Sequence, residues 1–286
     1  MKNIKEYCAE KKEELKNYIR DNDLQIRTVI IQVGDNQASN AYIKGKIKDC
    51  REVGIDCGLI HFDEDITEGA LIQVIKDLNT EFGVDGYIVQ LPLPPHISEA
   101  KITAAIDYHK DIDGFTKNAL VNPATPQGIL TYLEDNNFNF VDANAVVIGR
   151  SNIVGRPMAR LLLDKSCNVT VLHSKTSAVK KAHYLSKADL VVVAAGHRNT
   201  LVDGDFHIYN GYTRDPNFNC FVVDVGINRN EEGKLCGDCE SLTICEKTPV
   251  PGGVGLLTRL ALISNIVKLY EINHANFDRK AEWLNK

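Results

Sequence analysis

The chain lacks any apolar run of the ~18 residues that a membrane-spanning helix needs. Its N-terminus, MKNIKEYCAEKKEELKNYIR, is charged and amphipathic rather than an apolar signal segment, so the cytoplasm is the expected compartment. Positive charge is not in excess either, because 33 Lys and Arg stand against 38 Asp and Glu, a formal net charge of -5. Nucleic-acid phosphates require a basic surface, so neither nucleic acid nor membrane is an expected partner.

The eight cysteines lack the partners of a zinc site. Cys236 and Cys239 form a CxxC pair with Cys245 behind it, but no second CxxC and no HxxxH occurs elsewhere in the chain. In a chain without a secretion signal, free and mostly buried thiols are the expected state. We therefore expect no metal.

A length of 286 residues, with 44% hydrophobic and 25% charged residues, fits a globular protein of two domains. In the first half, strands and helices alternate, which favours a parallel α/β sheet. Ser39 is the expected N-cap of the second helix. The expected elements are a helix over 1–20, a strand over 27–33, a helix ending near 53, a strand over 58–62, a helix over 68–81 and a strand over 86–90.

The alternation restarts after a boundary within 115–125, which predicts a second α/β domain. The amphipathic terminal helix, 257–272, is followed by no strand and fits against either domain. The expected elements between them are helices over 126–133, 156–163 and 178–186, and strands over 145–148, 168–172, 190–194 and 218–225.

The turn Gly149-Arg-Ser-Asn-Ile-Val-Gly155 lies between a strand and a helix of this second domain. At such a turn a dinucleotide's pyrophosphate meets free backbone N–H groups and the positive end of the helix. Ser151 stands where the usual GxGxxG pattern has its second glycine, so a plain strand-to-helix turn is the alternative. The position inside a βαβ unit favours a nucleotide site.

The end of the next strand indicates which nucleotide is bound. NAD sites usually place Asp or Glu there, whereas this chain has His173, Ser174 and Lys175. A serine hydroxyl, a lysine and the guanidinium of Arg150 would attract the 2′-phosphate that a carboxylate repels. NADP is therefore the expected cofactor, and an ordinary exposed loop is the alternative.

The stretch Asn40-Ala-Tyr-Ile-Lys-Gly-Lys46 crowds lysines around a tyrosine. On a helix Tyr42 and Lys46 are i and i+4 and share one face, while Lys44 and Lys48 lie on roughly the opposite side, as solvated charges. Lys46 is a candidate general acid/base if burial lowers its pKa. A Tyr-xxx-Lys pair and a nucleotide turn also occur in short-chain dehydrogenases, but there the turn precedes the pair, and here the order is reversed.

Five segments together resemble the bifunctional methylenetetrahydrofolate dehydrogenase/methenyltetrahydrofolate cyclohydrolase family over nearly the whole chain. They are residues 33–39 with 42–46, 85–94, 110–114, 149–157 and 248–255. The resemblance implies two α/β domains, with folate in the cleft between them. The catalytic domain is 1–118, completed by 257–286, and a Rossmann-type NADP domain is 119–256.

The resemblance implies two reactions, NADP-dependent oxidation of 5,10-methylenetetrahydrofolate and hydrolysis of the methenyl product to 10-formyltetrahydrofolate. Lys46 matches the family's catalytic lysine, Tyr42 the tyrosine against the folate, Gln90 the residue that orients the lysine, and Asp113 the carboxylate on the pterin edge. Other implied substrate contacts are Pro251, Gly252 and Gly253. The implied cofactor contacts are Gly149, Arg150, Ser151, Ile153, Val154, Gly155, His173, Ser174 and Ile227.

The chain departs from the family pattern at Leu256-Leu257, at Arg259, where a small apolar residue is usual, and at Ala124. The resemblance also implies a homodimer formed through the nucleotide domain. Two alternatives remain open, a dehydrogenase without the hydrolysis step and a non-catalytic protein that senses NADP or binds folate.

Overall fold

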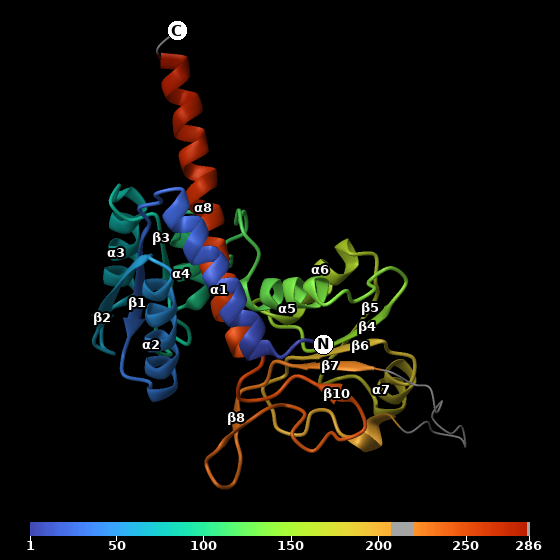
Figure 1. The fold of residues 1–286 in the computed structure, drawn as a ribbon. Coiled ribbons are helices and arrows are strands. Elements are labelled where there is room, and N and C mark those ends of the chain that lie inside the picture. Colours follow the sequence, from blue (N-terminus) through green and yellow to red (C-terminus); the bar gives the residue numbers. More distant parts are fainter. Residues whose placement is uncertain (207–219, 285–286) are drawn as a thin grey trace. The chain divides into compact units, whose positions relative to one another are not determined.

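The computed structural model describes residues 1–206 and 220–284, and the chain divides into two compact units (Figure 1). The first, here the sheet-A unit, comprises Ala9–Ala124 and Arg259–Lys286. The second, here the sheet-B unit, comprises Met1–Cys8 and Thr125–Thr258. Each has its own parallel sheet and its own hydrophobic core.

The sheet-A unit contains three parallel strands in the order β2 (Asp56–Phe62), β1 (Arg27–Val33) and β3 (Gly86–Val89). Side chains of both faces are buried in separate clusters, which explains why β1 reads as a continuous apolar run rather than an alternating one. One face is covered by α1 (Ile4–Asp21), α2 (Gln37–Glu52) and α8 (Val254–Leu284), and the other by α3 (Glu68–Thr80) and α4 (Glu99–Ala105).

The start of α2 corrects the sequence prediction that Ser39 is its N-cap. The helix begins at Gln37, and the side-chain oxygen of Asn36 accepts a hydrogen bond from the Ser39 N–H at 3.1 Å. Asn caps helices as well as Ser does, and Gly34, with φ of 72°, turns the chain just before it. Ser39 is therefore a buried residue of the first helical turn.

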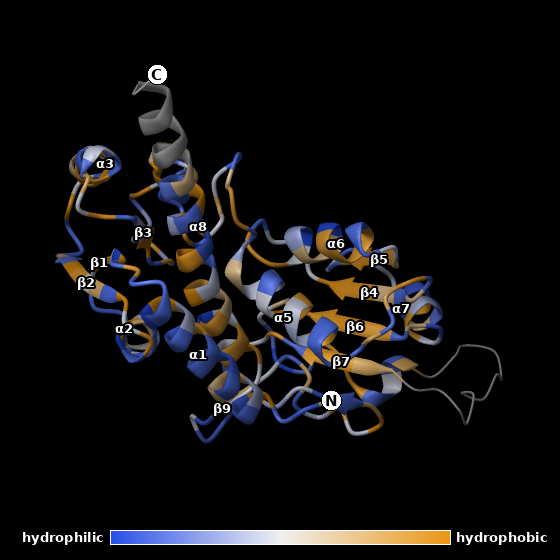
Figure 2. Cartoon of the chain, turned by 45° about the horizontal axis from the view of Figure 1, so that its top comes forward, coloured by the Kyte–Doolittle hydropathy of each residue, from blue (hydrophilic) through white to orange (hydrophobic). Residues whose placement is uncertain are grey.

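The sheet-B unit contains five parallel strands in the order β10, β7, β6, β4 and β5. The central strands are largely apolar (Figure 2) because α5 and α6 cover one face while α7 and η1 cover the other. The bounds are α5 Ala124–Asp135, β4 Asn144–Ile148, α6 Gly155–Asp164, β5 Asn168–Leu172, α7 Ala178–Leu185, β6 Leu190–Val193, η1 Asp203–Phe206, β7 Phe221–Asp224 and β10 Glu246–Lys247.

The elements that the sequence did not predict are short. They are α4, η1, the two-residue strand β10 and the antiparallel pair β8 (Asn228–Arg229) and β9 (Leu235–Cys236). Two-residue strands leave no periodicity to read in the sequence. Of the strand expected over 218–225, residues 218 and 219 lie outside the described residues.

The chain order of the sheet-B unit places a switch point at β4. After β4 the chain forms β5 on one side of it and then β6 on the other, so consecutive connections leave in opposite directions. Ligands of open α/β sheets bind at the carboxyl ends of the strands at such a point. Gly149 follows β4 directly and therefore lies at this switch point.

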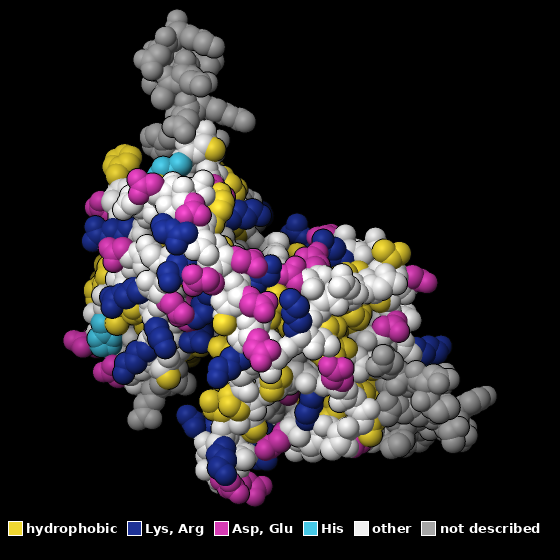
Figure 3. Space-filling model, viewed as in Figure 1, with side chains coloured by type: hydrophobic (Ala, Val, Ile, Leu, Met, Phe, Trp, Pro, Cys, Tyr) yellow, Lys and Arg dark blue, Asp and Glu magenta, His cyan; other side chains and the backbone are white. Residues whose placement is uncertain are grey.

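Acidic and basic side chains are interspersed on the molecular face in Figure 3. This face therefore has no broad positively charged surface that would bind a polyanion. Within residues 1–206 and 220–284, no helix is both long enough and apolar enough to cross a membrane.

Candidate catalytic and nucleotide sites

Lys46 is buried, with only 3% of its surface exposed, while Lys44 and Lys48 are exposed on the same helix. The helical period of α2 therefore separates the three lysines as the sequence predicted. The Lys46 ammonium lies 5.1 Å from the centre of the Tyr42 ring, one turn earlier on α2. This is a cation–π distance, so the two side chains form one face of a local site.

Gln90 brings an oxygen to this lysine from the end of β3. Lys46 Nζ donates to Gln90 Oε1 at 3.2 Å, and Gln90 Nε2 donates to the carbonyl of Leu91 at 2.7 Å. The second bond fixes the orientation of the amide, which leaves its oxygen toward the lysine. Gln90 thus orients the amine without adding a charge.

Asp113 supplies the carboxylate of the cluster. Its Oδ2 lies 3.9 Å from Lys46 Nζ. Burial raises the pKa of Asp113, the charge of Lys46 opposes that rise, and the neighbouring Asp111 adds to it. A carboxyl held in this way can exchange hydrogen bonds with a ligand in either protonation state.

The loop that carries Asp113 is held by a carboxylate that sequence reasoning missed. Asp111 is 1% exposed, and its two oxygens accept the backbone N–H groups of Gly114 at 2.9 Å and of Thr116 at 2.7 Å. The signal was present, because Asp111 and Asp113 both belong to the Lys-Asp-Ile-Asp-Gly segment. Nothing in one sequence, however, tells the carboxylate that holds the loop from the one that faces Lys46.

Gly114 and Asn265 fix the same loop from its other side. Gly114 has φ of 74°, and a Cβ there would lie 2.6 Å from the carbonyl carbon of Asn122. Asn265 of α8 is buried and donates to the carbonyls of Ile112 at 3.2 Å and Asn122 at 2.9 Å. The position of Asp113 therefore depends on α8, which is distant in sequence.

In the sheet-B unit, Gly149 and Gly155 form a turn that excludes larger side chains. Gly149 has φ of 128°, and its Cβ would lie 2.3 Å from the carbonyl oxygen of Ala194 at the end of β6. A Cβ on Gly155 would lie 2.4 Å from the carbonyl oxygen of Gly149. Both glycines are thus required by close backbone approach, as in dinucleotide-binding turns.

The side chain of Ser151 accepts hydrogen bonds within this turn, which a glycine could not do. Its Oγ accepts the backbone N–H groups of Val154 at 3.2 Å and Gly155 at 3.3 Å, where α6 begins. It satisfies two of the N–H groups that every helix N-terminus leaves without an intrahelical partner. The departure from GxGxxG therefore has a structural role.

The residues expected to select the nucleotide lie at the ends of adjacent strands. Arg150 is exposed after β4, and Ser174 and Lys175 are exposed after β5. His173 is half-buried, and its Nδ1 accepts the Lys175 N–H at 3.2 Å, which closes a tight turn. The sheet order puts β5 beside β4, so these side chains share one edge of the sheet.

Two exposed isoleucines and the buried Asp224 complete this edge. Ile153 is 40% exposed and Ile227 65%, and Val154 caps α6. Ile227 follows a turn held by Asp224, whose oxygens accept the backbone N–H groups of Gly226, Asp238 and Cys239. Burial raises the pKa of Asp224. Sequence reasoning missed this carboxylate, which looks like an ordinary strand-end residue.

Asp238, between the two cysteines of the CxxC pair, holds a neighbouring turn. Cys236 and Cys239 are buried, and Asp238 between them accepts the backbone N–H groups of Ala195 at 2.8 Å and Gly196 at 2.9 Å. In the described part of the chain no group of His, Cys, Asp or Glu is arranged to hold a metal ion.

Pro251, Gly252 and Gly253 also belong to the sheet-B unit. The Val250–Pro251 peptide is cis, and Gly252 has φ of 95°. A Cβ on Gly253 would lie 2.2 Å from the carbonyl oxygen of Pro249. Pro251 and Gly252 are exposed and Gly253 is buried, so the loop offers backbone rather than long side chains to a ligand.

Both units match models of one protein family. Residues 2–113 match the model of the tetrahydrofolate dehydrogenase/cyclohydrolase catalytic domain, and residues 123–274 match that of its NAD(P)-binding domain. The chain belongs to the tetrahydrofolate dehydrogenase/cyclohydrolase family. The predicted fold class, an α/β catalytic domain plus a Rossmann-type domain, is thereby confirmed.

Relatives within the tetrahydrofolate dehydrogenase/cyclohydrolase family are similar over most of their length. The bifunctional protein FolD of Nitrosomonas europaea is 41% identical over 276 residues, which cover 91% of this chain and 90% of that one. The crystal structure of the bifunctional FolD methylenetetrahydrofolate dehydrogenase/cyclohydrolase from Campylobacter jejuni has a TM-score of 0.85 and 38% identity. It covers 95% of this chain and 98% of the other.

A structure that holds the nucleotide is also similar. It is the Trypanosoma brucei methylenetetrahydrofolate dehydrogenase-cyclohydrolase complexed with NADP cofactor and inhibitor. Its TM-score is 0.83 at 26% identity, over 96% of this chain and 97% of that one. Together with the NAD(P)-binding family model, this agrees with NADP as the cofactor.

Proposed function

We propose that this chain is a bifunctional NADP-dependent methylenetetrahydrofolate dehydrogenase and methenyltetrahydrofolate cyclohydrolase. It oxidises 5,10-methylenetetrahydrofolate to the methenyl form, and water then opens the methenyl ring to give 10-formyltetrahydrofolate. The observation that carries the proposal is the buried amine of Lys46, held by Gln90 and Asp113 and faced by Tyr42, in a chain of this family.

Lys46 transfers the proton during hydrolysis. Attack of water on the methenyl carbon releases a proton, and ring opening requires one at the nitrogen that leaves. An amine at a fixed position can accept the first and donate the second, which is general acid–base catalysis. Gln90 keeps Nζ in place through its 3.2 Å bond, and burial of Lys46 limits exchange with bulk water.

Asp113 and Tyr42 bind the substrate. The amino and ring N–H groups on the edge of a pterin are two parallel donors, which one carboxylate can accept together. The Tyr42 ring offers a flat apolar face against the folate, next to the amine that it helps to position. Pro251, Gly252 and Gly253 would let the ligands approach the backbone closely.

The sheet-B unit binds NADP, which accepts the hydride when bound. The turn 149–155 would hold the pyrophosphate, because the glycines allow a close approach and α6 directs its N-terminus there. Arg150, Ser174 and Lys175 would bind the 2′-phosphate, since all three are exposed at one sheet edge without a carboxylate at the strand end. His173, Ile153, Val154 and Ile227 would line the remainder of this site.

The decisive experiment measures both activities on one preparation, with each nucleotide. We expect NADPH to form from methylenetetrahydrofolate and NADP⁺, and methenyltetrahydrofolate to be hydrolysed. Lys46→Met should lower the hydrolysis kcat by about 100-fold or more, the usual worth of a general acid–base. The matched control Lys48→Met removes an exposed lysine of the same helix and should change it less than about twofold.

Each other outcome identifies an alternative. Full hydrolysis by Lys46→Met would overturn the assignment of the lysine. Oxidation without hydrolysis by the natural chain would identify a dehydrogenase alone, and the lack of both reactions would identify a binding protein.

We also propose a homodimer formed through the sheet-B unit, working in the cytoplasm. Strand β5 is an edge of its sheet, and Val171 on it is 39% exposed while Leu163 of the preceding helix is 63% exposed. An edge with apolar side chains is suited to pairing with a second copy. Eight free cysteines fit a reducing compartment. Light scattering at the concentration of the activity assays tests the dimer.

A further inference from the structure

Arg259 of α8 makes a partly buried ion pair with α2, the helix of Lys46. Its Nε lies 3.0 Å from Oδ2 of Asp49, whose side chain is 8% exposed. The other oxygen of Asp49 lies 3.3 Å from Lys12 Nζ. A buried carboxylate needs such partners, because losing one leaves a charge that water cannot reach.

Gly45 provides the space that the guanidinium occupies. A Cβ at this position would lie 2.1 Å from Arg259 Nη1 and 3.2 Å from its central carbon, so no side chain fits there while Arg259 stays in place. Glycine in a helix interior costs roughly 0.5–1 kcal/mol relative to alanine. Arg259 therefore lies against the backbone of α2 at the residue before Lys46.

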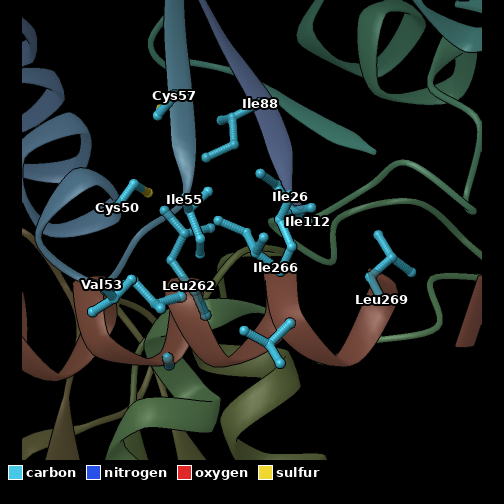
Figure 4. Close-up of a cluster of buried hydrophobic side chains, with 14 of the residues drawn as sticks. Ile26, Cys50, Val53, Ile55, Cys57, Ile88, Ile112, Leu262, Ile266 and Leu269 are labelled. Atoms are coloured by element: carbon cyan, nitrogen blue, oxygen red, sulfur yellow. The ribbon is translucent and has the colours of Figure 1, made fainter. Parts of the chain in front are cut away.

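The two helices are otherwise joined by apolar packing. Ile43 and Cys50 of α2 and Leu262 and Ile266 of α8 belong to one buried cluster, which Figure 4 shows beneath the strands. This apolar packing holds the two helices together, but it is non-directional and does not orient any charged side chain. The Arg259–Asp49 pair adds a directional link beside that cluster.

Asp49 lies one turn after Lys46 on the same helix face, at i+3. Side chains at this spacing are neighbours on a helix, and an unpaired carboxylate there would attract the ammonium. In the structure Lys46 instead contacts Gln90 at 3.2 Å and Asp113 at 3.9 Å. Asp49 does not compete for the Lys46 ammonium, because its two oxygens are paired with Arg259 and Lys12.

We propose that Arg259 is a positioning residue for the hydrolysis reaction. Its guanidinium forms an ion pair with Asp49 and lies against the backbone of α2 at Gly45. The Lys46 amine therefore stays hydrogen-bonded to Gln90 instead of pairing with Asp49. The inference rests on the proposed function, since it takes Lys46 as the proton-transfer group. Arg259 itself contacts neither Lys46 nor Gln90 through any interaction found in the described residues.

The test compares Arg259→Leu, Asp49→Asn and the double variant with the natural chain. Arg259→Leu should lower the hydrolysis kcat by about tenfold to 100-fold, the usual effect of misplacing a catalytic group by about 1 Å. KM for methenyltetrahydrofolate should change less than about threefold, because Tyr42 and Asp113 are untouched. The oxidation rate should fall less than the hydrolysis rate.

The double variant separates positioning from general loss of structure. Arg259→Leu with Asp49→Asn removes the competing charge, so most of the lost kcat should return although the ion pair is still absent. Asp49→Asn alone should stay within about threefold of the natural kcat. Lys48→Leu, which removes an exposed positive charge from α2, is the control and should leave both rates unchanged.

If Arg259→Leu does not fold, Gly45→Ala tests the same proposal. It displaces the guanidinium while favouring helix, so the hydrolysis kcat should fall without loss of helix content. An undiminished kcat in Arg259→Leu or Gly45→Ala, or a double variant as slow as Arg259→Leu, would overturn the proposal. Failure of the proposed function is seen separately, as absent hydrolysis in the natural chain or full hydrolysis by Lys46→Met.

Discussion

Replacing Gly114 by alanine should both destabilise the chain and weaken folate binding. Gly114 has φ of 74°, where any residue with a Cβ costs roughly 1–2 kcal/mol. The new Cβ would lie 2.6–2.8 Å from three backbone atoms of Asn122 and Pro123. Relieving the contact displaces the Asn122 carbonyl, which accepts a hydrogen bond from Asn265 that contributes about 0.5–1.5 kcal/mol.

Together these terms predict a loss of about 1.5–3.5 kcal/mol, or a fall of roughly 3–14 °C in the thermal midpoint. Because Gly114 follows Asp113, the KM for methylenetetrahydrofolate should rise as well. Calorimetry and steady-state kinetics measure the two effects. Gly69→Ala is the matched control, since a Cβ there meets nothing within 4 Å and the residue lies in α3. If Gly114→Ala melted within about 2 °C of Gly69→Ala, the argument from backbone contact would be refuted.

Three further changes test the nucleotide turn and the buried carboxyl. Arg150→Ala should lower the ratio of kcat/KM for NADP⁺ to that for NAD⁺ by about tenfold or more, the worth of one charged hydrogen bond, and an unchanged ratio would remove Arg150 from the 2′-phosphate site. Ser151→Ala should cost about 1 kcal/mol of unfolding free energy in denaturant titration, because it removes the acceptor for two N–H groups, and an unaltered midpoint would contradict this. Burial raises the pKa of Asp113, so its contribution to stability is present below the unfolded pKa of ~3.9 and is lost as pH rises through the folded pKa. The thermal midpoint of Asp113→Asn, relative to that of the natural chain, should therefore rise as the pH increases from 4. If the difference between the two midpoints did not change with pH, the raised pKa of Asp113 would be excluded.

The long elements could be predicted from the sequence because each has a period or an apolar run. The helical period of α2 by itself distinguishes buried Lys46 from exposed Lys44 and Lys48. The buried strands β1 and β4 lie where their runs of Val and Ile indicate. The helix start was wrong by a few residues because Asn36 and Ser39 are both good caps, and only the backbone path decides between them.

The supporting residues could not be predicted, because their roles depend on contacts between distant segments. Asp111 and Asp224 resemble any acidic residue at a turn until their backbone donors are seen. Arg259 was visible as a departure from the family pattern. Its proposed positioning role depends on a contact with Gly45, which lies more than 200 residues earlier in the chain.

The divided composition of the sheet-A unit has a consequence for synthesis on the ribosome. Ala9–Ala124 is made first, but the cluster that closes its core takes Leu262, Ile266 and Leu269 from α8. The whole of Thr125–Thr258 is translated in between, which takes on the order of ten seconds at typical rates of synthesis. During that interval the nascent segment exposes one apolar face of its sheet, so chaperones have a defined target, and a ribosome stalled before Arg259 would hold a domain unable to complete its fold.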